Sequence, residues 1–410
     1  MKKLFILALV ALFAAFILSS CGSSDNKPDA PETEEPSTEE STALETTEGH
    51  PELDYEFYKI FEAPKGDYRE IAYNYMLAMA NYKWIAGEDF SIAWKDEGDF
   101  KVNLDFKKGE TYYGLPYSEQ RASLEQFSQF VAEGGTFTSD TYYYEEIIGN
   151  HCSSSMGLAY QQLIDFPYAG SLKPVGERRG VIKLIDGLEQ PAGETTKDWY
   201  SEDVINLNGK EKIFEAYAKM GKGDILGKFV KTSGHSRMVS HVEIYKTAAG
   251  KIIPARSLVY TIEQTNAFDK TTKDRNTTWW IEHSYTFQEL LDTKFIPLTL
   301  EIFHNGEQLE NAYIAFDDKN TPESILKTIN GTVTSNFPIS YVRATITDSD
   351  GNIVGEIYRR KFDKSYKVNL RTDYSSLNIS KLEPGTYTYS LHAGIARGGT
   401  EIESFQFTIG

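Results

Sequence analysis

The sequence predicts an α+β domain followed by an all-β sandwich, both placed behind an N-terminal export segment. Helical periodicity dominates the chain up to about Ala216, period-2 alternation replaces it afterwards, and short strands with Gly, Asp and Asn turns fill the chain from about Leu298. Helices first and an antiparallel meander second are typical of an α+β fold. We therefore divide the chain into an export signal, a tether, the α+β domain and the sandwich, at residues 1–20, 21–50, 51–297 and 298–410.

The N-terminal segment has the organisation of a signal peptide. Lys2 and Lys3 precede an apolar stretch over 4–17, which is shorter than the roughly 20 residues of a membrane span. The stretch ends in Leu18-Ser19-Ser20-Cys21, which resembles the lipobox of bacterial lipoproteins. The resemblance implies that Cys21 is acylated. The chain is then held by lipid at the outer membrane or at the outer face of the cytoplasmic membrane, outside the cytoplasm.

Residues 22–50 predict a disordered tether. The segment is rich in Pro, Glu, Ser and Thr, its acidic side chains are opposed only by Lys27, and it offers little apolar surface to bury. Charge repulsion would keep it extended. The formal net charge of the whole chain is -18, which argues against a nucleic-acid partner because binding to nucleic acid depends on clustered Lys and Arg.

Three helices are expected in the first part of the α+β domain, and strands in the second. Apolar residues near a 3.6 period predict helices over 68–85 and 123–132, and a third helix begins just after Cys152. Period-2 segments then predict strands over 224–230, 236–245 and 257–264, a further strand from Trp279, and a short helix over 286–291.

The C-terminal region is expected to be a β-sandwich. Its strands are predicted at 298–303, 312–316, 340–347, 352–359, 367–371 and 403–409, and residues 382–391 are predicted to be a turn that runs into a further strand. This architecture resembles the immunoglobulin-like modules often appended to exported bacterial enzymes.

Cys152 is the candidate nucleophile. It is the only cysteine besides Cys21, so it has no partner for an internal disulfide if Cys21 is acylated. Three serines and a predicted helix follow it directly. The positive end of the helix dipole favours the thiolate, which is the reactive form of cysteine.

A thiolate nucleophile needs a histidine base and a polar residue that orients the base. Two histidines, His235 and His241, lie on one predicted strand, and the next strand ends in Glu263 and Gln264. Equal parity predicts that both histidines face the same side. His235 is favoured as the base because it lies at the open end of the strand, with His241 as the alternative. Gln264 is favoured as the orienting residue, with Glu263 as the alternative.

This order of motifs resembles the NlpC/P60 superfamily of papain-like cysteine peptidases and amidases. A Cys-Ser pair opens a helix, a Gly-Asp strand follows, and two strands then carry His and a polar residue. The resemblance covers residues 110–295 and implies a papain-like fold that cleaves amide bonds in cell-wall peptides, typically next to γ-D-glutamate. It also implies that Tyr113 and Tyr117 line the substrate cleft. The chain departs from the family pattern at His151 and Ser154, where Asp and Gly are usual.

The predicted function is therefore that of a lipid-anchored cysteine hydrolase of the cell envelope. Its expected partners are the membrane, through Cys21, and peptidoglycan stem peptides or another envelope peptide or glycan. No phosphate-binding glycine loop or spaced metal-ligand cluster is present, so no cofactor or metal is expected. Two alternatives stay open: a non-catalytic surface-binding lipoprotein of the same fold, and an exported peptidase or transglutaminase-like enzyme that acts on proteins.

Overall fold

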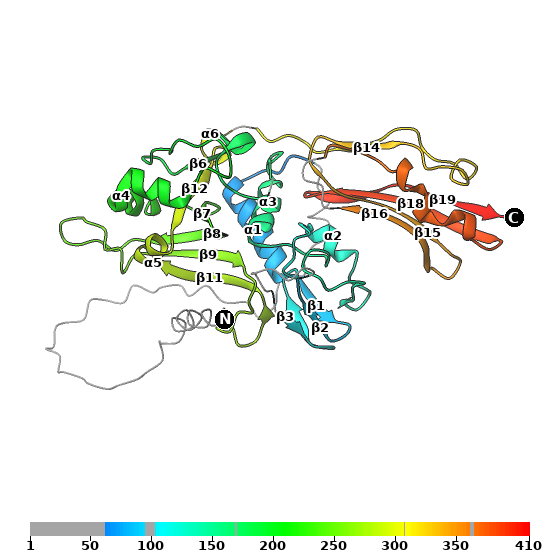
Figure 1. The fold of residues 1–410 in the computed structure, drawn as a ribbon, viewed down its shortest axis with the longest axis horizontal. Helices are drawn as coiled ribbons and strands as arrows, with labels where there is room; N and C mark the ends of the chain where they lie inside the picture. Colours follow the sequence, from blue (N-terminus) through cyan, green and yellow to red (C-terminus); the bar gives the residue numbers. More distant parts are fainter. Residues whose placement is uncertain (1–61, 95–101, 103, 169, 307, 361–364) are drawn as a thin grey trace, which may run out of the picture. The chain divides into compact units, whose positions relative to one another are not determined.

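The structure is a computed structural model, which describes residues 62–94, 102, 104–168, 170–306, 308–360 and 365–410 (Figure 1). The predicted signal segment, the lipidation site at Cys21 and the predicted tether lie outside the described residues. Within the described part of the chain, none of the helices is long and apolar enough to cross a membrane.

Helix α1, Tyr68–Asn81, begins where the sequence predicts and ends earlier. Asp67 caps its N-terminus by accepting a hydrogen bond from the backbone N–H of Arg69 at 2.8 Å. The expected end of this helix instead forms strand β1, Lys83–Ala86. Trp84 explains the change, because its buried ring stacks on Tyr112 of the paired strand with 5.0 Å between ring centroids.

An antiparallel six-stranded sheet forms the centre of the α+β body. Its order is β11-β9-β8-β7-β12-β6. The strands are β6 Ile182–Leu184, β7 Ile225–Val230, β8 Ser233–Glu243, β9 Leu258–Gln264, β11 Trp279–Thr286 and β12 Phe295–Leu300. The strands expected over 224–230, 236–245 and 257–264 therefore form at nearly the expected bounds.

Two β-bulges interrupt this sheet, and they determine which side chains share a face. In β8, Val239 pairs with Thr261 but His241 pairs with Tyr260, so Ser240 is an extra residue. In β11 the corresponding extra residue is Glu282, which has a positive φ of 55°. An inserted residue reverses the alternation of side chains, so residues before and after a bulge lose the parity expected from their numbers.

The body contains five further helices: α2 Leu124–Ser128, α3 Cys152–Tyr160, α4 Ser201–Tyr217, α5 Phe287–Asp292 and α6 Ile302–Asn305. Helices α1 and α3 lie side by side, and α3 packs on β8 and β9 (Figure 1). Helix α4 contacts β7 and β12. The sequence analysis did not predict α4, which contains a non-helical residue, Gly209.

A smaller four-stranded sheet, β10-β4-β1-β5, and a β-hairpin, β2-β3, complete the body. The bounds are β2 Phe90–Ile92, β3 Leu104–Phe106, β4 Thr111–Tyr113, β5 Thr136–Phe137 and β10 Asn276–Thr277. Aromatic rings from both pack around Trp84, so ring contacts join the hairpin to the small sheet.

The C-terminal region contains two antiparallel sheets, β13-β14-β17 and β16-β15-β18-β19, around a hydrophobic core of their own. The bounds are β13 Ile314–Phe316, β14 Thr332–Ser335, β15 Ile339–Thr347, β16 Ile353–Arg360, β17 Lys367–Asn369, β18 Gly385–Ile395 and β19 Gly398–Ile409. Val333 and Val368 from the first sheet meet Val342 and Leu391 from the second in this core. The described chain is thus a mixed α+β protein with several antiparallel sheets.

The boundary expected between residues 297 and 298 falls inside β12 and needs correction. Leu298–Leu300 pair with β6 in the six-stranded sheet, so this strand belongs to the body and not to the C-terminal sheets. The two regions also share contacts. Ala396, between β18 and β19, lies in the body's hydrophobic core, and its carbonyl accepts hydrogen bonds from Gln162 at 2.7 Å and Tyr75 at 3.2 Å.

Candidate active site

Cys152 is the first residue of α3, as the sequence predicts. His151 precedes it in an extended conformation, and its backbone N–H donates to Oγ of Ser154 at 2.9 Å. The Ser154 side chain therefore caps the start of the helix. The N–H groups of a first helical turn have no intrahelical acceptor, so this turn offers donors beside the sulfur. Cys152 itself is 9 % exposed.

The imidazoles of His151 and His235 lie close enough to the thiol of Cys152 to affect its ionisation. Burial alone would raise the pKa of the thiol. The charge on His235 and the nearness of both imidazoles outweigh burial, so the pKa of Cys152 lies well below its ordinary value. The arrangement therefore favours a thiolate at neutral pH.

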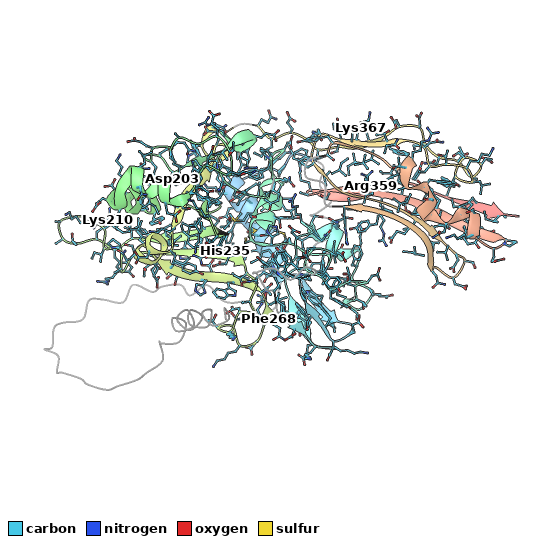
Figure 2. All side chains as sticks on the ribbon, in the orientation of Figure 1. Asp203, Lys210, His235, Phe268, Arg359 and Lys367 are labelled. Atoms are coloured by element: carbon cyan, nitrogen blue, oxygen red, sulfur yellow. The ribbon has the colours of Figure 1, made fainter. Side chains whose placement is uncertain are left out.

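His235 connects the thiol to a buried carboxylate. It lies on β8 (Figure 2), and its Nε2 binds Oε2 of Glu263 on β9. The register places Arg237 opposite Glu263, and His235 shares their face because it lies two residues before Arg237. No bulge intervenes between these positions, so the pairing of strands β8 and β9 brings the imidazole and the carboxylate together.

Two further side chains hold Glu263. Its side chain is 1 % exposed, and it receives hydrogen bonds from Nε of Arg237 at 2.9 Å and from the hydroxyl of Tyr285 at 2.6 Å. Burial would raise the pKa of Glu263, but Arg237 and His235 lower it to about 2. The Arg237 guanidinium also lies over the rings of Tyr285 and Phe295, at 3.7 and 3.9 Å from their centroids.

His235 is consequently a strong base in this setting. Burial would lower its pKa, but Cys152 and Glu263 raise it to about 9. With the pKa of Cys152 lowered and that of His235 raised, thiolate and imidazolium coexist over the neutral range. This ion pair can supply both a nucleophile and a proton donor.

The orienting residue at the imidazole is Glu263, the alternative in the sequence analysis, and not Gln264. Successive residues of a strand point to opposite faces, so Gln264 faces away from the carboxylate. Its Nε2 donates to the carbonyl oxygen of Leu115 at 2.8 Å, and Nε1 of Trp279 donates to the same oxygen at 3.1 Å. Gln264 therefore holds the segment that leads to Tyr117.

His241 does not share the face of His235, which corrects the expectation from equal parity. The bulge at Ser240 reverses the alternation, and the imidazole of His241 stacks on Tyr260 with 4.1 Å between ring centroids. Its side chain is 51 % exposed, and Nδ1 lies 3.4 Å from Glu282. The structure thus separates the two candidate bases.

The two tyrosines expected in the cleft lie in different places. Tyr117 is buried and lies close to the thiol of Cys152. Burial and the neighbouring Cys152 raise its pKa, so the phenol stays protonated and can donate to a negative sulfur or oxygen. Tyr113 lies on β4, where the guanidinium of Arg275 covers its ring at 4.5 Å.

Arg237 and Tyr285 are the site residues that the sequence analysis missed. The spacing could have indicated Arg237, because a residue two positions after His235 on the same strand shares its face. Tyr285 follows the bulge at Glu282, so no simple alternation predicts it. Among the described residues, no group of three or more His, Cys, Asp and Glu side chains could hold a metal ion.

No family model and no curated protein matches the chain. A comparison with solved structures finds a similarity to a crystal structure described as a tetra-tandem repeat in the extending region of a large adhesion protein. The identity is 18%, and the match covers 45% of this chain and 40% of that chain, with a TM-score of 0.16. A TM-score this low carries no argument about fold or function.

Proposed function

We propose that this protein is a cysteine hydrolase that cleaves amide bonds in the cell envelope. The observation that carries the proposal is the convergence of Cys152, His235 and Glu263 from α3, β8 and β9. A nucleophile, a base and a group that orients the base are the three parts of nucleophilic acyl transfer. The buried ion pair between Arg237 and Glu263 adds a fixed charge behind the base.

The side chains suggest a two-step reaction. The thiolate of Cys152 attacks the carbonyl carbon of an amide, and the first-turn N–H groups of α3, with the Tyr117 hydroxyl, stabilise the oxygen as it becomes negative. The C–N bond then breaks, and the imidazolium of His235 gives its proton to the leaving amine. In the second step His235 takes a proton from water, the hydroxide attacks the thioester, and the Cys152 thiolate is released.

The finer features of the proposal rest on the sequence. We include three such features in the proposal: a papain-like body, immunoglobulin-like C-terminal sheets and a lipid anchor at Cys21. Peptidoglycan stem peptides are the proposed substrate. They are the substrate class that the motif order implies, and a lipid-anchored chain outside the cytoplasm would meet them.

Alkylation of Cys152 by iodoacetamide tests the proposal. The rate is measured from pH 4 to 9 by mass spectrometry of the Cys152 peptide, which separates it from Cys21. His235→Ala is the informative variant, and His241→Ala is the matched control from the same strand. We expect fast labelling well below the free-thiol pKa of about 8.5, lost in His235→Ala and retained in His241→Ala.

Slow labelling that follows an ordinary thiol titration in all three proteins would contradict the hydrolase. That outcome would leave the non-catalytic surface-binding lipoprotein as the better account. If labelling behaves as expected, purified peptidoglycan is incubated with the protein and with Cys152→Ala. New amino termini released only by the unsubstituted protein would identify stem peptides as the substrate.

A further inference from the structure

The segment that connects β8 to β9, residues 244–256, forms a hairpin with hydrogen bonds of its own. Lys246 and Ile252 pair across it, and the backbone N–H of Gly250 donates to the carbonyl of Thr247 at 2.8 Å to close the turn. Figure 1 shows this segment projecting beyond the neighbouring strands. It follows the end of β8 opposite to the end that carries the proposed catalytic base. A rise of about 3.3 Å per residue puts its tip roughly 30 Å from that base.

The base of the 244–256 hairpin is fixed to the body. Ser257 is fully buried, and its Oγ accepts a hydrogen bond from the N–H of Tyr245 at 3.0 Å and donates to the carbonyl of Tyr245 at 3.3 Å. The start of α5 holds the other arm, because the N–H of Gln288 donates to the carbonyl of Pro254 at 3.2 Å. The exposed groups of the hairpin are therefore presented in a constant arrangement.

The 244–256 hairpin is positively charged, although the formal net charge of the whole chain is -18. It contains Lys246, Lys251 and Arg256 and has no Asp or Glu. All three cationic residues are exposed, and none of them forms an ion pair with a carboxylate in the described part of the chain. A cluster of unpaired cations on an acidic protein fits an anionic partner.

Apolar side chains are exposed on the same hairpin. Ile244 is 41 % exposed and Tyr245 is 39 % exposed, and the turn itself presents the small residues Ala248 and Ala249 to solvent. Neighbouring residues of an extended arm point to opposite sides, so both sides of the hairpin are uncovered. A protein surface would cover one side of such a projection, whereas the headgroup region of a bilayer can surround its tip. The combination of apolar tip and flanking cations is typical of segments that lie in a membrane interface.

We propose that the 244–256 hairpin inserts its tip into the surface of a bilayer that contains anionic lipids. The turn and Ile244 enter the interface, and the ring of Tyr245 lies at the level of the headgroups, which suits an apolar ring with a polar end. Lys246 and Lys251, on facing arms, extend their ammonium groups back to the lipid phosphates. The hairpin does not use the thiol, so this proposal stands or falls separately from the proposed hydrolase.

Hydrogen exchange of the full chain tests the proposal, with mass spectrometry of the peptides that cover the hairpin. Exchange is measured without vesicles, with phosphatidylcholine vesicles and with vesicles that also contain phosphatidylglycerol. Lys246→Gln combined with Lys251→Gln removes two charges from the hairpin. Lys270→Gln combined with Lys273→Gln is the matched control, at two exposed lysines between β9 and β10. A lipid at the N-terminus would attach every variant to both kinds of vesicle, so the readout is the local protection of the hairpin.

We expect the anionic vesicles to protect the hairpin of the unsubstituted chain and of the control, and the neutral vesicles to leave it unprotected. Removing Lys246 and Lys251 should raise the lipid concentration for half-maximal protection roughly thirtyfold, the effect of two cations at an anionic surface. Ile244→Ser should also reduce the protection.

Three results would each overturn the proposal: equal protection by neutral and anionic vesicles, no protection by either, or equal behaviour of the double variant and its control. Soluble polyphosphate is the further arm. Protection by polyphosphate but not by vesicles would assign the hairpin to an anionic polymer and overturn the membrane contact. The comparison of the two kinds of vesicle needs no variant, so it holds even if a variant does not fold.

Discussion

Arg237 and Glu263 form a buried ion pair, with 2.9 Å between Nε and Oε2, and the same carboxylate oxygen binds the imidazole of His235. The guanidinium therefore keeps Glu263 ionised in a place where burial alone would favour the protonated acid. The charge that orients His235 depends on a residue that does not touch the thiol. Arg237 is thus a positioning residue for the proposed reaction.

Arg237→Met should destabilise the protein strongly, because it leaves the Glu263 carboxylate buried without its cation. We expect the free energy of unfolding in urea to fall by about 3–5 kcal/mol. Lys212→Met is the control, since its ion pair with Glu189 is exposed and should contribute less than about 1 kcal/mol. Similar, small losses of unfolding free energy in both variants would show that the buried ion pair contributes no more to stability than the exposed one.

Glu263→Gln should raise the pKa of Cys152 while keeping the shape of the side chain. Without the carboxylate charge the imidazolium of His235 is less stable, so it supports the thiolate less well. Once the pKa of Cys152 exceeds 6, alkylation at pH 6 should slow about tenfold for each further unit by which the pKa rises. Glu356→Gln, which removes a carboxylate paired with Arg343 in the C-terminal sheets, should leave the pH profile of alkylation nearly unchanged.

Stability should fall in acid and should be nearly level from about pH 6.5 to 9. The pKa of Glu263 is lowered from 4.5 to about 2, so its contribution is complete above 4.5 and is lost as pH falls toward 2. Between 6.5 and 9 the folded pair holds one proton on His235, and the unfolded pair holds one proton on Cys152. The pair then does not make the free energy of unfolding depend on pH, because the folded and unfolded states bind the same number of protons.

Thermal unfolding midpoints measured from pH 3 to 9 check this profile. Glu263→Gln should show a shallower loss below pH 4.5, since its side chain does not titrate. A steep dependence between 6.5 and 9 in the unsubstituted protein would contradict the assignment of one proton to this pair in both states.

The sequence identified the nucleophile and its helix, but the acid–base partners needed the strand register. Cys152 could be found because the local signals of a lone thiol, serines and a helix start lie within a few residues. Glu263 and Gln264 are adjacent and both polar, so residue type could not decide between them. Their faces depend on pairing with β8, which is a non-local property.

Gly114→Ala should disturb both stability and the segment that carries Tyr117. Gly114 has a φ of 80°, and a Cβ there would lie 2.2 Å from Cδ1 of Trp279. We expect a loss of more than about 2 kcal/mol in urea unfolding, from the left-handed backbone and the clash together. Alkylation of Cys152 should change too, because Trp279 and Gln264 hold Leu115 at the start of this segment.

Gly109→Ala is the matched control for this prediction. Gly109 has nearly the same φ, 79°, but open space around its Cβ position. It should lose only the conformational part, about 1–2 kcal/mol, with unchanged alkylation. Equal losses at both positions would mean that Trp279 moves aside without cost.

Two shortened chains test where the body ends. A chain ending at Pro297 lacks the half of β12 that pairs with β6, so we expect it not to fold cooperatively. A chain ending at Gly306 keeps β12 and α6 and should fold, with a lower melting temperature. It loses Ala396 from the hydrophobic core of the body, together with the carbonyl that accepts hydrogen bonds from Gln162 and Tyr75. Equal melting temperatures of the two shortened chains would contradict the revised boundary.

The sequence located several strands within two residues but assigned β12 to the wrong sheet. Apolar and polar residues alternate over 298–303 as they do in the strands that follow. This alternation indicates that a segment is a strand, but it does not indicate which strands it pairs with. The pairing of Leu298 with Leu184 and Ile225 joins segments more than seventy residues apart. Such long-range pairing is invisible to local periodicity.

The single extra residue at Ser240 gives β8 two chemically independent surfaces. Before it, His235 and Arg237 contact the Glu263 carboxylate. After it, His241 faces the other side of the sheet and stacks on Tyr260 of β9. Substitutions at His241 can therefore accumulate without altering proton transfer at Cys152. Deleting Ser240 would remove the bulge but keep the pairing of Val239 with Thr261 and of His241 with Tyr260, so the two imidazoles would still face opposite sides. Only a shift of register after Val239, which pairs Ser240 with Tyr260, would bring a second imidazole to the side of the Glu263 carboxylate.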